Sequence, residues 1–127
     1  MFLYITLGTN NLTEAKRFYE AVMPTLGLTL REEDADEIGY GPPAPDRIRF
    51  WVTKPYNGQA ATTANGSMPA FAAATREAVD AFHAAGLAAG GTDEGAPGLR
   101  PYGKNFYACY LRDPDGNKLS AVCDTLE

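Results

Sequence analysis

The sequence predicts an α+β fold built from two βαβββ modules. In the first half of the chain, strand-like alternation precedes an amphipathic helical pattern and further strand-like segments. The same order returns about sixty residues later, a period too long for a solenoid repeat. The chain has 127 residues, 45% of them hydrophobic, which is enough for one compact domain with a core. We therefore expect a single domain with module one over about residues 1–55, a linker over about 56–66 and module two over about 67–127.

The elements of the first module are predicted by alternation and capping signals. Residues 3–9 alternate between apolar and polar side chains, which predicts a strand with one buried face. Asn11 offers an N-cap oxygen and Glu14 completes a capping-box pattern, so an amphipathic helix is expected to follow and to end before Pro24. Further strands are expected over residues 28–32, 37–40 and 47–53.

The second module repeats this order. Residues 68–73 have the pattern of its opening strand, and Thr75 is the expected N-cap of its helix. Gly90 and Gly91 are expected to end that helix, because glycine accommodates the backbone of a helix C-terminus. A Gly/Pro-rich connection over residues 91–103 then precedes the last two expected strands, over residues 105–112 and 118–123.

Composition and charge exclude several functions. The net charge is −5, the sequence pI is about 4.8, and no Lys/Arg cluster is present, so binding to nucleic acid or to an anionic membrane is not expected. The N-terminus MFLYITLGTNN contains no basic leader, and no segment approaches the ~20 apolar residues of a membrane span. We therefore expect a cytoplasmic protein. Cys109 and Cys123 lack metal-site spacing and are expected to be free thiols.

Four features of the sequence occur together: an opening strand LYITLGTNNL, a helix TEAKRFYEAV, the repeated module order and a terminal DPDGNKLSAV. The DPDG turn alone indicates only a hairpin. In combination, the four features resemble the glyoxalase/bleomycin-resistance/dioxygenase superfamily, also called the vicinal oxygen chelate superfamily. The segment AVDAFHAAGLAAGGTDEGAPGLRP is similar to its bacterial glyoxalase-like branch. The resemblance covers nearly the whole chain and implies mixed sheets curved into an open, barrel-like cavity, usually in a homodimer.

The resemblance also implies where a metal would be held in metal-dependent members. Their ligands are a His in the first strand, a His or Glu in the fifth, a carboxylate or amide in the fourth and a Glu in the last. Carried over residue by residue, the first-, fifth- and last-strand positions are Tyr4, Met68 and Ser120. None of these is a normal ligand for a divalent ion, and the fourth-strand face offers Arg49 and Trp51. We therefore expect no metal site and no cofactor.

Three other features could suggest chemistry, and each has a structural interpretation. His83 is the only histidine and is expected at the surface or boundary of its helix, where it can pair with Asp80, because one imidazole cannot make a metal site. Residues 31–37 are acidic but lack calcium-loop spacing, so a solvated hairpin turn is expected. Cys109 has no histidine partner in the sequence, which favours a structural thiol over a nucleophile.

The resemblance implies a ligand cavity lined by aromatic and hydrogen-bonding side chains. Arg49 or Arg100 could hold a carboxylate or phosphate, and Trp51 and Tyr4 could stack on a planar or cationic group. The alternative is that these aromatic side chains fill the cavity as core. Alternation does not decide which face of residues 105–112 lines the cavity. The candidate ligand-binding residues are Tyr4, Thr6, Arg49, Trp51, Met68, Arg100, Tyr102, Tyr107 and Ser120.

Three functions are compatible with this sequence. The first is a metal-free protein that binds a small organic molecule, as drug-sequestering members of the superfamily do. The second is a metal-independent lyase or isomerase in which Tyr4, Ser120 or Tyr107 donates a proton or a hydrogen bond. The third is a metal-dependent enzyme, like lactoylglutathione lyase or a dioxygenase, if the ligand positions lie elsewhere. The sequence favours small-molecule binding, leaves catalysis uncertain and does not identify the ligand.

Overall fold

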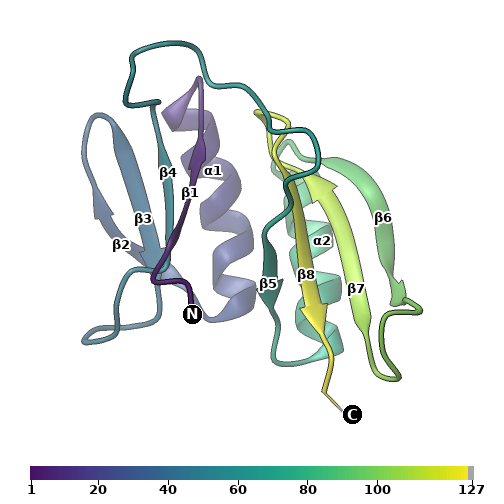
Figure 1. Ribbon diagram of the computed structural model, residues 1–127. Coiled ribbons are helices and arrows are strands. Elements are labelled where there is room, and N and C mark those ends of the chain that lie inside the picture. Colours follow the sequence, from purple (N-terminus) through teal and green to yellow (C-terminus); the bar gives the residue numbers. More distant parts are fainter. Residues whose placement is uncertain (126–127) are drawn as a thin grey trace.

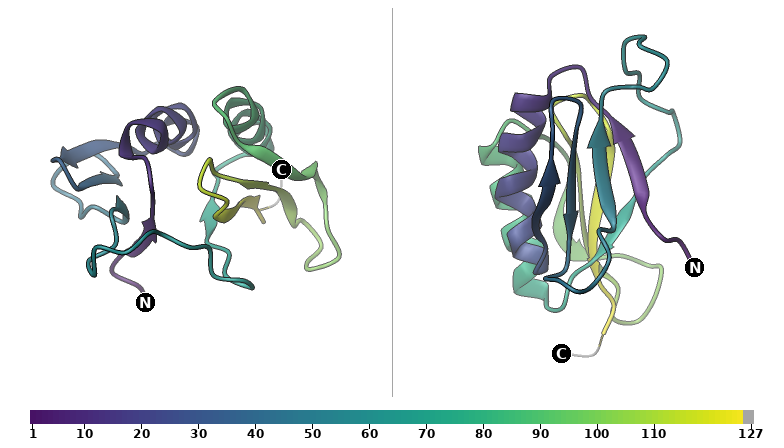
Figure 2. Two further views of the ribbon diagram at one scale, coloured as in Figure 1. Left: turned by 90° about the horizontal axis from the view of Figure 1, so that it is seen from above. Right: turned by 90° about the vertical axis from the view of Figure 1, so that its left-hand side faces the viewer.

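The computed structural model describes residues 1–125 and has two four-stranded mixed sheets, with both helices on one side of them (Figures 1 and 2). The α+β class and the two modules are confirmed. The two sheets remain separate and are not closed into a barrel. Within the described residues, neither helix has the length and apolar character needed to cross a bilayer.

The first sheet has the strand order β1-β4-β3-β2. Strand β1 pairs in parallel with β4, which pairs antiparallel with β3, and β3 pairs antiparallel with β2. The predicted N-cap is confirmed, because the Asn11 side chain accepts a hydrogen bond from the backbone N–H of Glu14. The elements of this module are β1 (Ile5–Gly8), α1 (Leu12–Val22), the 3-10 helix η1 (Met23–Leu26), β2 (Thr29–Glu33), β3 (Glu37–Gly41) and β4 (Phe50–Thr53).

The second sheet repeats this topology in the order β5-β8-β7-β6. Its helix also has the predicted cap, since the Thr75 side chain accepts a hydrogen bond from the backbone N–H of Ala78. The elements of this module are β5 (Ala70–Ala72), α2 (Arg76–Ala88), β6 (Thr92–Leu99), β7 (Tyr107–Arg112) and β8 (Lys118–Cys123).

Strand β6 corrects one sequence prediction, because it runs through the Gly/Pro-rich segment that was expected to be only a connection. Its pairing with β7 shifts register twice, which removes the regular alternation by which strands are recognised. As an edge strand it also tolerates Pro97, whose missing N–H would interrupt a central strand.

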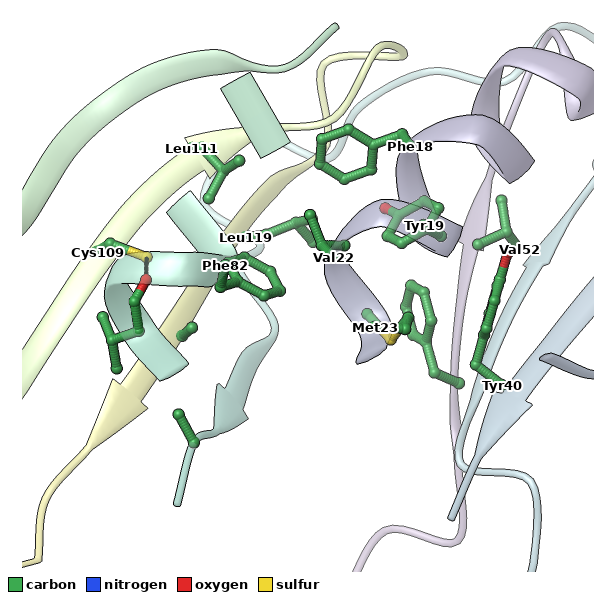
Figure 3. Packing of buried hydrophobic residues seen from close by; sticks show 14 of the residues in the cluster. Phe18, Tyr19, Val22, Met23, Tyr40, Val52, Phe82, Cys109, Leu111 and Leu119 are labelled. Carbon is green, nitrogen blue, oxygen red and sulfur yellow. Dashed lines mark hydrogen bonds between the residues drawn. The ribbon is translucent and has the colours of Figure 1, made fainter. Parts of the chain in front are cut away.

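The core lies between the helix layer and the two sheets (Figure 3). An aromatic contact also connects the modules. Phe50 of the first sheet stacks edge-to-face on Phe71 of the second, with ring centroids 5.2 Å apart. The helices approach each other at Gly86, where an added Cβ would lie 3.4 Å from Phe18 and from Val22 of α1. Burial of these apolar surfaces is the main stabilising contribution to the fold.

The last hairpin joins the modules through a buried carboxylate. Asp113, which is 2% exposed, accepts a 2.6 Å hydrogen bond from the hydroxyl of Tyr19 in α1. Its other oxygen accepts from the backbone N–H groups of Asp115 and Asn117, which shapes the turn. The Asn117 amide then donates both to Asp113 and to the Gly8 carbonyl at the end of β1. The turn is therefore bound to a helix and a strand of the other module.

We predict that Tyr19→Phe lowers the free energy of unfolding by about 2 kcal/mol, because a hydrogen bond to a buried carboxylate is lost without a change in shape. Urea denaturation measures this change. Tyr56→Phe is the matched control, since Tyr56 is fully exposed. Equal stability of the two variants would contradict the assigned role of the Tyr19 hydroxyl.

Asp113 also predicts a pH dependence of stability. Burial raises the pKa of Asp113 above its ordinary value, although hydrogen bonds from Tyr19 and Asn117 partly offset this rise. A raised pKa means that the folded state binds a proton more readily, so this contribution to stability falls as pH rises from the unfolded pKa through the folded one. In Asp113→Asn this decrease in stability with rising pH should be absent, because the amide does not ionise. Urea midpoints measured from pH 4 upward check this, and parallel profiles for both proteins would contradict it.

Candidate functional site

The face of the first sheet away from the helices presents one continuous row of residues. Strand register places Glu32, Gly39, Trp51 and Thr6 side by side across β2, β3, β4 and β1. Alternation directs Phe50 and Val52 into the core and Trp51 to the opposite face. A Cβ at Gly39 would lie only 2.6 Å from the Trp51 ring, so the indole lies directly across this glycine. Gly39 is therefore needed for the position of Trp51.

A cavity of about 670 Å³ opens over this row, a size typical of small-molecule sites. The half-buried Trp51 forms part of its wall, together with Thr6 of β1 and Tyr4 just before that strand. Side chains of β2 and β3 and the connection between β3 and β4 supply the remaining wall. The lining residues are Tyr4, Thr6, Arg31, Glu32, Glu37, Pro45, Asp46, Arg47, Ile48 and Trp51.

Arg31 braces the loop that closes one end of this cavity. Its Nη1 donates hydrogen bonds to the backbone carbonyls of Pro42 and Asp46. The register of β2 shifts at Arg31, a bulge that changes the direction of a strand side chain. The Nη1 group of Arg31 therefore holds the loop in place, and its two N–H donors are occupied by backbone carbonyls.

The second sheet carries a separate cavity of about 610 Å³, lined by Met68, Arg112, Lys118 and residues 63–67. On this sheet, Arg100 lies over the Tyr110 ring, 5.3 Å from its centroid, and Lys118 lies 5.8 Å from the same centroid. Ser120, the register partner of Tyr110, is fully buried, and its Oγ has no hydrogen-bond partner among the described residues. This sheet therefore exposes basic groups beside a buried hydroxyl.

The structure brings together only part of the predicted ligand-binding set. Tyr4, Thr6 and Trp51 share the first cavity, whereas Met68 lines the second. Arg49 is exposed and, with Tyr4, lines a small apolar groove of about 150 Å³ between the edges of β1 and β5. A second hollow of about 210 Å³ also lies between the modules, with Thr6 and Gly8 of β1 on one side and Asn117 and Lys118 on the other.

The β7 side chains settle which face of residues 105–112 meets the core. Tyr107, Cys109 and Leu111 face the helix layer, and the Tyr107 hydroxyl donates a 2.6 Å hydrogen bond to Asp80 of α2. This bond to a carboxylate raises the pKa of Tyr107, with burial contributing in the same direction. Tyr102 is 72% exposed and packs only edge-on against Phe106. Tyr107 and Tyr102 therefore lie away from both open-face cavities.

The positions that hold a metal in metal-dependent relatives do not fit one here. Tyr4 and Met68 present a phenol and a thioether, and Ser120 presents a neutral hydroxyl inside the protein. Nowhere in residues 1–125 do three His, Cys, Asp or Glu side chains form a group able to hold a metal ion. The donor set of the chain therefore provides no metal centre at this position.

His83 and Cys109 have structural contacts. His83 is buried and pairs with Asp93 of β6 at 2.8 Å, so the expected partner Asp80 was wrong. Burial raises the pKa of Cys109 to about 11, and its thiol contacts the Val79 carbonyl of α2. A thiol with this pKa is almost entirely protonated at neutral pH, which supports the structural role.

Sequence reasoning missed the polar rim of the first cavity. Arg31, Glu32 and Glu37 were expected at the ends of two strands and in the solvated turn between them, and no cavity was assigned to them; the structure has these strands and the turn between them. The bulge at Arg31 hides which face these side chains take. Arg47 could have been found, because it has the same parity as Trp51 in the alternating segment.

Comparison with known proteins agrees with this architecture. The family model described as the Glyoxalase/Bleomycin resistance protein/Dioxygenase superfamily matches residues 2–120. The chain belongs to this superfamily. A glyoxalase/bleomycin resistance protein from Albidiferax ferrireducens T118 is 44% identical, with a TM-score of 0.87 over 98% of this chain and 99% of that one. No match was found among curated proteins.

More distant superfamily members share the fold. A glyoxalase-related enzyme from Fulvimarina pelagi is 21% identical, with a TM-score of 0.75 over 97% of this chain and 87% of that one. A lactoylglutathione lyase from Agrobacterium tumefaciens is 20% identical, with a TM-score of 0.65 over 97% and 92% of the two chains. At these identities the likeness concerns the fold alone.

We predict that Gly39→Ala displaces the Trp51 indole, because the new methyl group would occupy the space of the ring. The expected cost is about 1–3 kcal/mol in the free energy of unfolding, with a shift in tryptophan emission. Trp51 is the only tryptophan, so the emission reports on this position alone. Gly103→Ala is the matched control, because that glycine has no positive φ and an added Cβ would meet only ordinary contact with Phe106 at 3.6 Å. Unchanged emission in Gly39→Ala would contradict the placement.

Proposed function

We propose that this protein binds a small organic molecule in the cavity over Trp51, and that binding rather than a metal-centred reaction is its function. The observation that carries the proposal is the Trp51 indole, held across Gly39 in the wall of a cavity of about 670 Å³. A partly exposed indole is a contact surface that ligand sites commonly use, and here it is surrounded by five charged side chains. The name of the Albidiferax ferrireducens protein, which includes bleomycin resistance, is compatible with a binding role.

The metal-independent lyase or isomerase has less support. Its three candidate donors are separated: Tyr4 is on the first sheet, Ser120 is on the second, and Tyr107 faces α2. A general acid or base must come within hydrogen-bond reach of the same reacting group as its partners. One observation favours this second function: the buried Ser120 hydroxyl has no hydrogen-bond partner among the described residues and could donate to a substrate.

We also propose that the protein acts as a cytoplasmic homodimer in which the first sheet of each copy faces the second sheet of its partner. The first cavity has Glu32, Glu37 and Asp46 on its rim, whereas the second sheet exposes Arg100 and Lys118. In a dimer with two-fold symmetry, this contact between an acidic and a basic surface would occur twice. The free cysteines Cys109 and Cys123 are compatible with a reducing compartment.

We predict that a thermal-shift screen of small molecules finds compounds that raise the melting temperature of the natural protein. A ligand at one hundred times its Kd adds about 2.7 kcal/mol of stability. Trp51→Ala should lose most of the shift, and Tyr56→Ala, at an exposed linker site, should retain it. Equal shifts in both variants would place binding elsewhere.

Two further measurements separate the other functions. Stoichiometric Ni, Zn, Fe or Mn in the purified protein would contradict the metal-free function. Enzymatic turnover that survives a chelator and is lost in Ser120→Ala would favour the metal-independent lyase or isomerase.

We predict that sedimentation velocity shows a dimer that Lys118→Glu shifts toward monomer, because the substitution places a like charge opposite the acidic rim. Arg17→Glu makes the same charge change on an exposed position of α1 and should leave the dimer intact. A monomer in the natural protein, or equal dissociation of both variants, would contradict the proposed pairing of sheets.

A further inference from the structure

Resting on the proposed ligand site, we propose that the molecule bound over Trp51 is an organic cation: an ammonium or amidinium compound that also carries an aromatic or alkyl group. The inference depends on the chemistry of three parts of the first cavity. These parts are the indole of Trp51, the carboxylates beside it and the arginines at the loop end.

The indole offers the most favourable aromatic face for a cation. Trp51 is half-buried and held across Gly39, so its ring orientation is fixed before any ligand arrives. A cation over the face of a tryptophan is attracted by the ring quadrupole, and the attraction strengthens as water is removed. The ring also buries apolar surface of the same ligand. A fixed indole therefore suits a ligand that is both charged and apolar.

Two carboxylates beside the indole have no ion pair within the described chain, and in the proposed homodimer a cationic ligand would compete for them with the basic groups of the facing sheet. Glu32 shares the cross-strand row of Gly39 and Trp51, and Glu37 lies two residues before Gly39 on the same face of β3. Within residues 1–125, neither carboxylate forms an ion pair, whereas the neighbouring Glu33 pairs with Lys16 at 2.9 Å. A smaller hollow of about 110 Å³, also lined by Glu32, Glu37 and Trp51, adjoins the cavity. The negative charge is thus placed at the indole.

The arginines do not convert the cavity into an anion site. Arg31 uses its Nη1 donors on the Pro42 and Asp46 carbonyls. Arg47 is exposed on the loop, where it follows Asp46 directly in the chain. Three carboxylates and two guanidinium groups line the cavity, so an anion would meet a net negative charge. This distribution favours a cation over the carboxylate or phosphate ligand that the sequence also allowed.

Fluorescence of Trp51 tests the proposal directly, because it is the only tryptophan in the full chain. The probes are benzyltrimethylammonium, its neutral isostere neopentylbenzene, and benzoate, each titrated with excitation at the red edge of tryptophan absorption. We expect saturable quenching by benzyltrimethylammonium with an affinity about fivefold or more above that for neopentylbenzene, and none by benzoate. Added salt should weaken the ammonium complex.

The variants separate charge from aromatic contact. Glu32→Gln combined with Glu37→Gln keeps the shape of the site and should weaken ammonium binding about three- to tenfold, with binding of the neutral isostere unchanged. Glu20→Gln removes the same charge from an exposed position of α1 and should change neither affinity.

Equal affinity for ammonium and isostere, tighter binding of benzoate, or absence of saturable quenching by the ammonium ion would each overturn the cation assignment. The proposed ligand site itself fails only if the thermal-shift screen also finds no molecule whose effect depends on Trp51. The two failures are therefore distinguishable.

Discussion

The hydrogen bond between Tyr19 and Asp113 is the constraint on which the arrangement of the two modules depends. It connects the middle of α1 to the turn between β7 and β8, residues that lie 94 positions apart in the chain. The same carboxylate organises the turn that places Asn117 against Gly8. Because the carboxylate is buried, losing one of its partners would leave its charge less well compensated. Together with the shared core, this bond joins two modules whose open faces lie on the same side of the molecule, away from the helices (Figure 2).

The resulting architecture separates the modules while keeping their helices together. Aromatic contacts such as Phe50 on Phe71 bridge the sheets beneath their edges, and Gly86 allows the helices to pack closely. Each open face therefore has its own cavity and its own charge character. This division explains why residues expected to share one cavity, such as Tyr4 and Ser120, belong to different surfaces.

The fold could be predicted from the sequence because its signals are local. Capping by Asn11 and Thr75 and the alternation before and after them depend on neighbouring residues, and the structure confirms them. Strand β6 could not be predicted, because its pairing is irregular and involves residues far along the chain. For the same reason, the sequence did not identify the partner of His83. The actual partner, Asp93, reaches His83 only after the chain reverses direction.

The candidate site could be predicted in part. Alternation places Tyr4, Thr6 and Trp51 on one face, and the structure brings them together. The bulge at Arg31 and the loop over residues 42–48 are tertiary features, so the polar rim was not visible in the sequence. Arg49 has the parity of Trp51 but lies just before the start of β4, in the groove beside β5. Outside the strands parity is therefore an unreliable guide, because it is right for Arg47 and wrong for Arg49.

The contact of Trp51 with Gly39 has a consequence for how such a site can evolve. The indole occupies the volume that a side chain at position 39 would need, so a larger residue at 39 requires the Trp51 ring to move. A smaller residue at 51 would relieve this conflict, but it would deepen the cavity and remove its aromatic surface. Ligand preference in this lineage would then change in steps rather than gradually.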